Sequence, residues 1–243
     1  MNTTGIATIA PLQNVSLIYA ALERAMNRPS HLPGMVTAYG PAGWGKTFGA
    51  TYAANKKNAY YVELKSAWTR GAFLDAVLTE MGISEPGKQI HQKISQIAEQ
   101  LALSGRPLIV DEIDHFVEKK AVEIIRDIYE SSGAAILLIG EETVPTKLKQ
   151  WERFHGRMLD WVSVQAPTIQ DAKVLRNFYC KDVQVDDELV ELIHEKSNSS
   201  VRRICVNLAR VEEEAVGMGK KKMGLKEWAD RDLFTGDAAP RRT

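Results

Sequence analysis

One run of residues has the types and spacing needed to bind a triphosphate: Gly40, Pro41, Ala42, Gly43, Trp44, Gly45, Lys46 and Thr47. It matches the pattern G-x-x-x-x-G-K-[ST] in full. Backbone N–H groups must wrap closely around phosphate oxygens, and glycine permits this because it has no Cβ. Lys46 adds a charge for the β- and γ-phosphates, and Thr47 adds a hydroxyl ligand for Mg²⁺. The run predicts a loop that binds ATP with Mg²⁺, and Phe48 directly after it completes the expected cofactor-binding set.

Two acidic residues, Asp111 and Glu112, follow the apolar run Leu108-Ile109-Val110. An aspartate at the carboxyl end of a buried strand can hold Mg²⁺ through water beside a phosphate-binding loop. We therefore predict that Asp111 and Thr47 hold the metal. Glu112 is placed to orient and deprotonate the attacking water, while Lys46 serves both binding and catalysis. The alternative is that the two acids merely begin a solvated loop.

The elements around these motifs alternate between strand and helix. A β-rich run, Met35–Tyr39, leads into the loop, and a helix over Thr47 to about Asn55 would aim its positive end at the phosphates. Further strands are predicted over 60–64, 108–110, 134–139 and 158–164, and helices over 71–81, 90–103 and around 122–129. Such alternation is typical of an α/β fold, with a parallel sheet flanked by helices.

The pattern changes after Pro167, where only helices are indicated, beginning near Thr168, Asp186 and Ser199. We therefore predict four regions: a flexible N-terminal arm over 1–11, an α/β core over 12–166, a small all-helical lid over 167–233 and a disordered tail over 234–243.

The composition is that of an ordinary globular protein, with 44% hydrophobic and 26% charged residues. Lysine plus arginine (31) balances aspartate plus glutamate (31), so any DNA contact must use local patches. No long apolar run or signal peptide is present, which favours a cytoplasmic location and no membrane partner. Cys180 and Cys205 are expected to be reduced, packed thiols.

Together, the loop, the strand ending in Asp111-Glu112, a second apolar strand and the helical lid resemble the AAA+ ATPases, over residues 12 to about 230. The resemblance implies an arginine finger, a residue that reaches into a neighbouring subunit, at Arg153 or Arg157, with Arg157 nearer the strand. It also implies a sensor 2 arginine at Arg202, with Arg203 as the second candidate. The alternatives are an exposed arginine without a catalytic part and a solvated helical face.

The position of the sensor 1 group departs from the family pattern. Gly140-Glu141-Glu142 stands where asparagine, serine or threonine is usual. An anionic sensor facing a γ-phosphate is unfavourable unless it is protonated or bridged by Mg²⁺. A surface loop is therefore the alternative interpretation of these glutamates.

Two segments indicate a branch of the family. The run Tyr60–Thr69 with its following helix, and Ile139-Gly140-Glu141-Glu142, resemble the transposition helpers, which include the phage Mu B-like, IstB, TniB and TnsC groups. The resemblance implies ATP-dependent, sequence-nonspecific binding to double-stranded DNA, self-association into a ring or helical filament, and help to a transposase in choosing or using target DNA.

Local basic clusters could supply the DNA contacts: Lys56-Lys57, Lys119-Lys120, Lys147 with Lys149, and Lys220-Lys221-Lys222. Contacts to phosphates alone predict binding that weakens steeply with salt. Each cluster can also be read as a solubilising surface. Other functional interpretations are an AAA+ helicase loader or replication initiator acting on a protein partner, a nucleotide-dependent regulator that binds no DNA, and a metabolic kinase.

Overall fold

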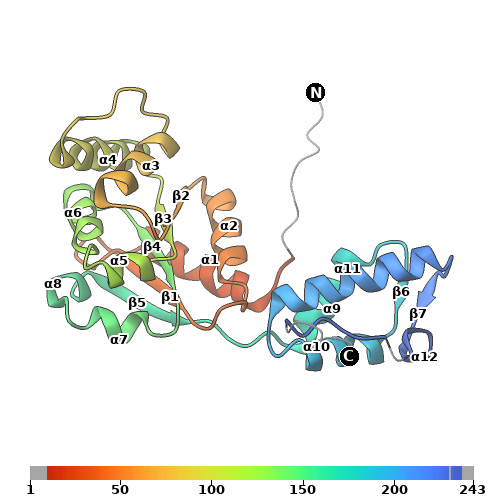
Figure 1. Ribbon diagram of the computed structural model, residues 1–243. Coiled ribbons are helices and arrows are strands. Elements are labelled where there is room, and N and C mark those ends of the chain that lie inside the picture. The colour runs from red at the N-terminus through yellow and green to blue at the C-terminus, as the bar shows by residue number, and fades with distance from the viewer. Residues whose placement is uncertain (1–9, 230, 237–243) are drawn as a thin grey trace, which may run out of the picture. The chain divides into compact units, whose positions relative to one another are not determined.

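The computed structural model describes residues 10–229 and 231–236 (Figure 1). They divide into two compact units. The first contains 15–41 and 46–164, and the second contains 10–14, 42–45, 165–229 and 231–236. The flexible arm and the disordered tail expected over 1–11 and 234–243 lie mostly outside the described residues.

The first unit is an α/β unit in which strands and helices alternate. Its strands are β1 (Met35–Tyr39), β2 (Tyr60–Glu63), β3 (Leu108–Asp111), β4 (Ile136–Gly140) and β5 (Met158–Ser163). Its helices are α1 (Gln13–Met26), α2 (Lys46–Lys57), α3 (Arg70–Glu80), α4 (Ile90–Ser104), α5 (Asp114–Glu118), α6 (Glu123–Ser132), α7 (Val144–Leu148) and α8 (Glu152–His155).

The five strands form one sheet in the order β2-β3-β4-β1-β5, and all of its pairings are parallel. This confirms the predicted α/β fold. In a parallel sheet the carboxyl ends of the strands meet at one edge, where ligands of open α/β sheets bind. The sheet order places β4 between β3 and β1. Consequently Gly40 after β1, Asp111 at the end of β3 and Gly140 at the end of β4 share that edge.

Apolar side chains fix the helices on the sheet. Every residue of β3 and β4 is buried, as expected for central strands covered on both faces. The apolar stripe of α4 includes Ile97 and Leu101, which pack with Ile125 and Ile128 of α6 in the core. Burial of such a side chain stabilises a fold by about 1.5–3 kcal/mol, so these stripes hold α4 and α6 against the strands that carry the site.

The second unit is mainly helical, but the all-helical lid predicted from the sequence is corrected by one short pair of strands. Its elements are α9 (Ile169–Tyr179), β6 (Gln184–Val185), α10 (Asp187–Lys196), α11 (Val201–Gly217), β7 (Lys222–Met223) and α12 (Leu225–Trp228). At the start of α9 the Thr168 hydroxyl accepts a hydrogen bond from the N–H of Asp171, and at the start of α11 Ser200 caps in the same way. The pair β6–β7 is parallel, and no sequence pattern indicated it.

Candidate nucleotide-binding site

The loop between β1 and α2 has a backbone that only glycine adopts readily. The φ angles of Gly40, Gly43 and Gly45 are 155°, 83° and 86°. A Cβ built on Gly40 would lie 2.5 Å from Cγ2 of Val164, so a side chain here requires a shift of Val164 or of the loop. A close-fitting loop that opens a helix is suited to an anionic phosphate.

Lys46 begins α2 and turns its ammonium group back onto the loop. Its Nζ donates to the carbonyl oxygens of Gly40 (2.7 Å) and Pro41 (3.0 Å). Burial lowers the pKa of Lys46, while the negative charges of Glu112 and Asp111 act to raise it. Charge-assisted hydrogen bonds are about twice as strong as neutral ones. An anionic phosphate would therefore be a better partner for this ammonium than the two carbonyls.

Asp111, at the end of β3, is 1% exposed. Its Oδ1 accepts from the N–H of Glu112 and its Oδ2 accepts from the hydroxyl of Tyr61, both at 2.8 Å. Burial raises the pKa of Asp111, whereas hydrogen bonds from Tyr61, Glu112 and Thr47 lower it. Burial also raises the pKa of Tyr61, and the charge of Asp111 raises it further. A buried carboxylate that contacts a threonine hydroxyl fits the oxygen ligands that Mg²⁺ requires.

Glu112 has a backbone φ of 58°, in the left-handed region. Non-glycine residues held there carry strain of about 1–3 kcal/mol, and they cluster at functional sites. The side chain is half-buried. Burial raises the pKa of Glu112, and the neighbouring charges of Asp111 and Asp114 add to this. A raised pKa brings a carboxylate closer to the range in which it can accept a proton from water.

Asp114 connects this acidic group to the end of β4. Its Oδ2 accepts from the backbone N–H of Glu141 at 2.8 Å, and its buried Oδ1 has no hydrogen-bond partner among the described residues. A Cβ on Gly140 would lie 2.9 Å from the same Oδ2, so glycine is needed for this approach. The side chains of Glu141 and Glu142 are exposed. The contact that Asp114 makes at the end of β4 is thus with a backbone N–H.

The candidate arginines fall in both units. Arg153 on α8 and Arg157 just after it are exposed in the first unit. Arg157 donates to Oε1 of Glu130 from Nε at 3.0 Å and from Nη2 at 2.8 Å. Arg202 and Arg203 lie in the first turn of α11 in the second unit, where Arg202 is exposed.

In the second unit, two hydrogen bonds to backbone carbonyls hold the tip of the loop, one from a backbone N–H and one from a side chain. The carbonyl of Gly43 accepts from the N–H of Val201 at 2.8 Å. The Asn14 side chain donates to the carbonyls of Trp44 (2.8 Å) and Gln165 (2.7 Å), and is 4% exposed. This segment of the loop is thus fixed to the start of α11.

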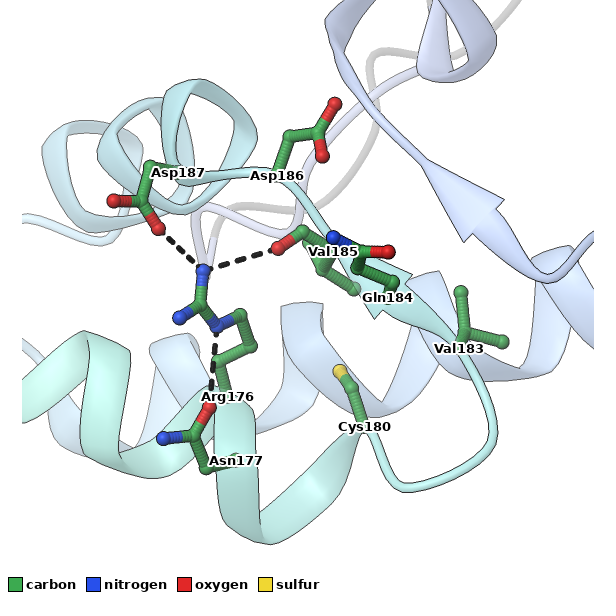
Figure 2. A pocket seen from close by; sticks show the side chains of 8 residues that line it. All are labelled: Arg176, Asn177, Cys180, Val183, Gln184, Val185, Asp186 and Asp187. Atoms are coloured by element: carbon green, nitrogen blue, oxygen red, sulfur yellow. Dashed lines mark hydrogen bonds and ion pairs between the residues drawn. The ribbon is translucent and has the colours of Figure 1, made fainter.

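The second unit also contains a polar pocket of about 430 Å³ (Figure 2). It is lined by Arg176, Asn177, Cys180, Val183, Gln184, Val185, Asp186 and Asp187. Arg176 donates to the Val185 carbonyl and pairs with Asp187. Burial raises the pKa of the Cys180 thiol to about 12, so that it remains an unreactive, packed group.

The sequence did not single out Tyr61 or Asp114. Asp114 had a signal, because it lies three residues after Asp111 in the run Asp-Glu-Ile-Asp. Tyr61 had a weaker one, because it sits at alternate spacing with Glu63 on the strand predicted over 60–64. Neither signal identifies a partner without the order of the strands.

The chain resembles known proteins in sequence. The family model described as AAA domain matches residues 30–148. The Mu-like prophage FluMu DNA transposition protein B of Haemophilus influenzae is 25% identical over 168 residues, which cover 65% of this chain and 58% of that protein. Cell division protein C of Sulfolobus acidocaldarius is 23% identical over 214 residues, which cover 76% of this chain and 54% of that protein. The chain thus spans just over half the length of these curated relatives.

Solved structures show the same fold. The Aeropyrum pernix ORC1 protein, solved in complex with DNA, superposes with a TM-score of 0.64 at 14% identity, covering 86% of this chain and 61% of that one. Among the described residues, no helix is long and apolar enough to cross a membrane. Residues 30–148, which match the AAA domain, include the loop, Asp111 and Glu112, and the chain has the fold of these solved AAA+ structures.

Proposed function

We propose that this chain is an ATPase that binds double-stranded DNA without sequence preference when it holds ATP and Mg²⁺, assembles on the DNA, and helps a transposase select or use its target. The observation that carries the proposal is the grouping of Lys46, Asp111 and Glu112 around a glycine loop, in a chain similar to a DNA transposition protein B.

Each residue of the site has a distinct task in this proposal. The backbone of residues 40–45 and the ammonium of Lys46 hold the phosphates. Thr47 and Asp111 hold Mg²⁺, which supplies positive charge against the phosphate oxygens. Glu112 orients a water molecule and accepts its proton. Arg157, with Arg153 as the alternative, would act on the site of a neighbouring subunit, and Arg202 would couple the lid to the nucleotide.

The lysines of the basic clusters differ in whether an acidic side chain already pairs with them. Lys57 pairs with Glu23 at 2.6 Å, and Lys222 pairs with Asp186 at 3.2 Å. Lys220 and Lys221 are exposed and form no ion pair with another described residue. Residues 220–243 hold seven basic and four acidic side chains by sequence. We therefore propose that DNA phosphates contact this region first, and that assembly multiplies weak contacts along the duplex.

The test is fluorescence-anisotropy binding to a random-sequence duplex with ATP, with ADP and without nucleotide, followed by electron microscopy. We expect tight binding and rings or filaments with ATP alone. Between 50 and 200 mM salt, a protein with several phosphate contacts loses roughly 10³-fold in affinity. Lys46→Ala should abolish nucleotide and DNA binding together. The matched control is Lys93→Ala, which removes a lysine of α4 that pairs with Asp75 and belongs to none of the basic clusters.

Two results would count against the proposal. Equal DNA binding with and without ATP would show that nucleotide does not control it. No binding in any state would favour a protein cargo, as in a helicase loader or replication initiator, and a stable complex with a hexameric helicase would then be the next measurement.

A further inference from the structure

Tyr61 lies on the face of β2 that is turned away from the main core. Its neighbours Tyr60 and Val62 belong to the core cluster, and side chains alternate along a strand, so Tyr61 and Glu63 occupy the opposite face. β2 pairs in parallel with β3, with Tyr61 opposite Ile109 and Glu63 opposite Asp111. The Tyr61 ring can therefore reach diagonally toward the end of β3.

The hydroxyl of Tyr61 donates to Oδ2 of Asp111 at 2.8 Å, while the N–H of Glu112 donates to Oδ1 at 2.8 Å. One donor on each oxygen prevents the carboxylate from turning about its Cβ–Cγ bond without breaking a hydrogen bond. The carboxylate also contacts Thr47, the other expected metal ligand. Tyr61 thus acts on the residue that would hold the metal, through its hydrogen bond to Asp111, and not on the metal itself.

We propose that Tyr61 is a positioning residue for Mg²⁺: its hydroxyl holds the Asp111 carboxylate in the orientation from which Asp111 and Thr47 bind the metal of the nucleotide. The inference rests on the proposed ATP–Mg²⁺ site. A partner that orients a metal ligand typically changes metal affinity by about 10–100-fold when it is removed. Phenylalanine keeps the aromatic ring and its packing but lacks the hydroxyl, so Tyr61→Phe tests the hydroxyl alone.

The experiment measures binding of a fluorescent ADP in EDTA and across a Mg²⁺ titration, for the parent and for Tyr61→Phe. The matched control is Tyr19→Phe, because Tyr19 donates to a carboxylate oxygen of Glu23 at 2.9 Å on the surface formed by α1. We expect Tyr61→Phe to raise the Mg²⁺ midpoint about 10-fold and to leave the metal-free ADP affinity within about twofold. Tyr19→Phe should have the same metal-free ADP affinity and the same Mg²⁺ midpoint as the parent.

A double-mutant cycle with Asp111→Asn separates positioning from packing. If Tyr61 acts through Asp111, Tyr61→Phe should change the Mg²⁺ midpoint little in the Asp111→Asn background. Superimposable titrations of the parent and Tyr61→Phe would overturn the inference. So would an equal loss of metal-free and Mg²⁺-dependent binding accompanied by a lower Tm, which would indicate a structural role. If the ADP affinity of the parent did not depend on Mg²⁺, both the proposed metal site and this inference would be wrong.

Discussion

The Asp114 carboxylate accepts a hydrogen bond from the backbone N–H of Glu141 at 2.8 Å and thereby connects the segment after β3 to the end of β4. Its second oxygen is buried without a hydrogen-bond partner among the described residues. A backbone contact thus occupies the position where the family pattern predicts a polar side chain.

Asp114→Asn should gain stability relative to the parent as the pH rises. Burial raises the pKa of Asp114 above its ordinary 3.8 in the folded chain. As the pH passes 3.8 the unfolded chain loses this proton first, which favours unfolding of the parent. Asparagine keeps an acceptor oxygen for the N–H of Glu141, and it does not titrate, so its contribution to stability does not change with pH. The measurement is the free energy of unfolding in urea from pH 3.5 to 7, and a difference that falls with pH would contradict the prediction.

Asp187→Asn is the control of opposite sign for that series. Hydrogen bonds from Lys173 and Arg176 hold the pKa of Asp187 below its ordinary value in the folded chain. Its stabilising contribution is therefore present above pH 3.8 and is lost as the pH falls through the lowered pKa. Asp187→Asn should lose stability relative to the parent as the pH rises, so that the two variants diverge in opposite directions.

Gly40→Ala should abolish nucleotide binding, because the new Cβ would lie 2.5 Å from Cγ2 of Val164 and displace the loop. Overpacking of this kind costs about 1–3 kcal/mol in stability. Gly82→Ala is the control: Gly82 has a φ of 73° but nothing within 4 Å of an added Cβ. It should cost about 1–2 kcal/mol in backbone strain and leave nucleotide binding intact. Calorimetric titration with ATP and thermal unfolding distinguish the two effects, and normal ATP affinity in Gly40→Ala would refute the steric argument.

The strands and the loop could be predicted because their signals are local in the sequence. The loop pattern occupies consecutive residues, and the runs that became β1, β3 and β4 are short and apolar between breaks. The same locality explains the predicted starts of α9 and α11. At each start, the side chain of Thr168 or Ser200 accepts a hydrogen bond from the backbone N–H three residues later.

Contacts between strands could not be predicted in the same way. The hydrogen bond from Tyr61 to Asp111 requires β2 to lie beside β3 in one particular register, and a shift of one residue would turn Tyr61 to the other face. The contact of Asp114 with Glu141 requires β4 to be the next strand along. The pair β6–β7 is two residues long in each strand, too short to show a period of two.

Glu112→Gln should bind ATP normally and hydrolyse it about 10²–10⁴-fold more slowly, because glutamine cannot accept a proton from water. If hydrolysis releases DNA, this variant should also remain on DNA long after the parent has dissociated. Rapid-mixing measurements of ATP turnover and DNA release test both statements. Glu142→Gln, an exposed change next to the end of β4, is the control. Release as fast as that of the parent would show that hydrolysis does not time the DNA complex.

Arg157→Ala should bind ATP normally but lose roughly 10³-fold in turnover if Arg157 acts on the site of a neighbouring subunit. The pair with Glu130 joins side chains that are 45% and 41% exposed, and such surface pairs contribute about 0–1 kcal/mol. Breaking this ion pair therefore costs little when Arg157 turns to a phosphate of the neighbouring subunit. Arg153→Ala, with an exposed arginine on α8, should retain turnover if Arg157 is the finger.

Mixing two inactive variants determines whether Arg157 acts between subunits. Lys46→Ala keeps Arg157 but loses its own site, whereas Arg157→Ala keeps its site but loses the arginine. A mixed assembly places intact sites beside intact arginines, so the mixture should recover part of the ATPase activity that neither variant has alone. Activity that does not recover, in assemblies shown to contain both variants, would place the action of Arg157 within its own subunit. Loss of turnover in Arg153→Ala instead would assign the finger to Arg153.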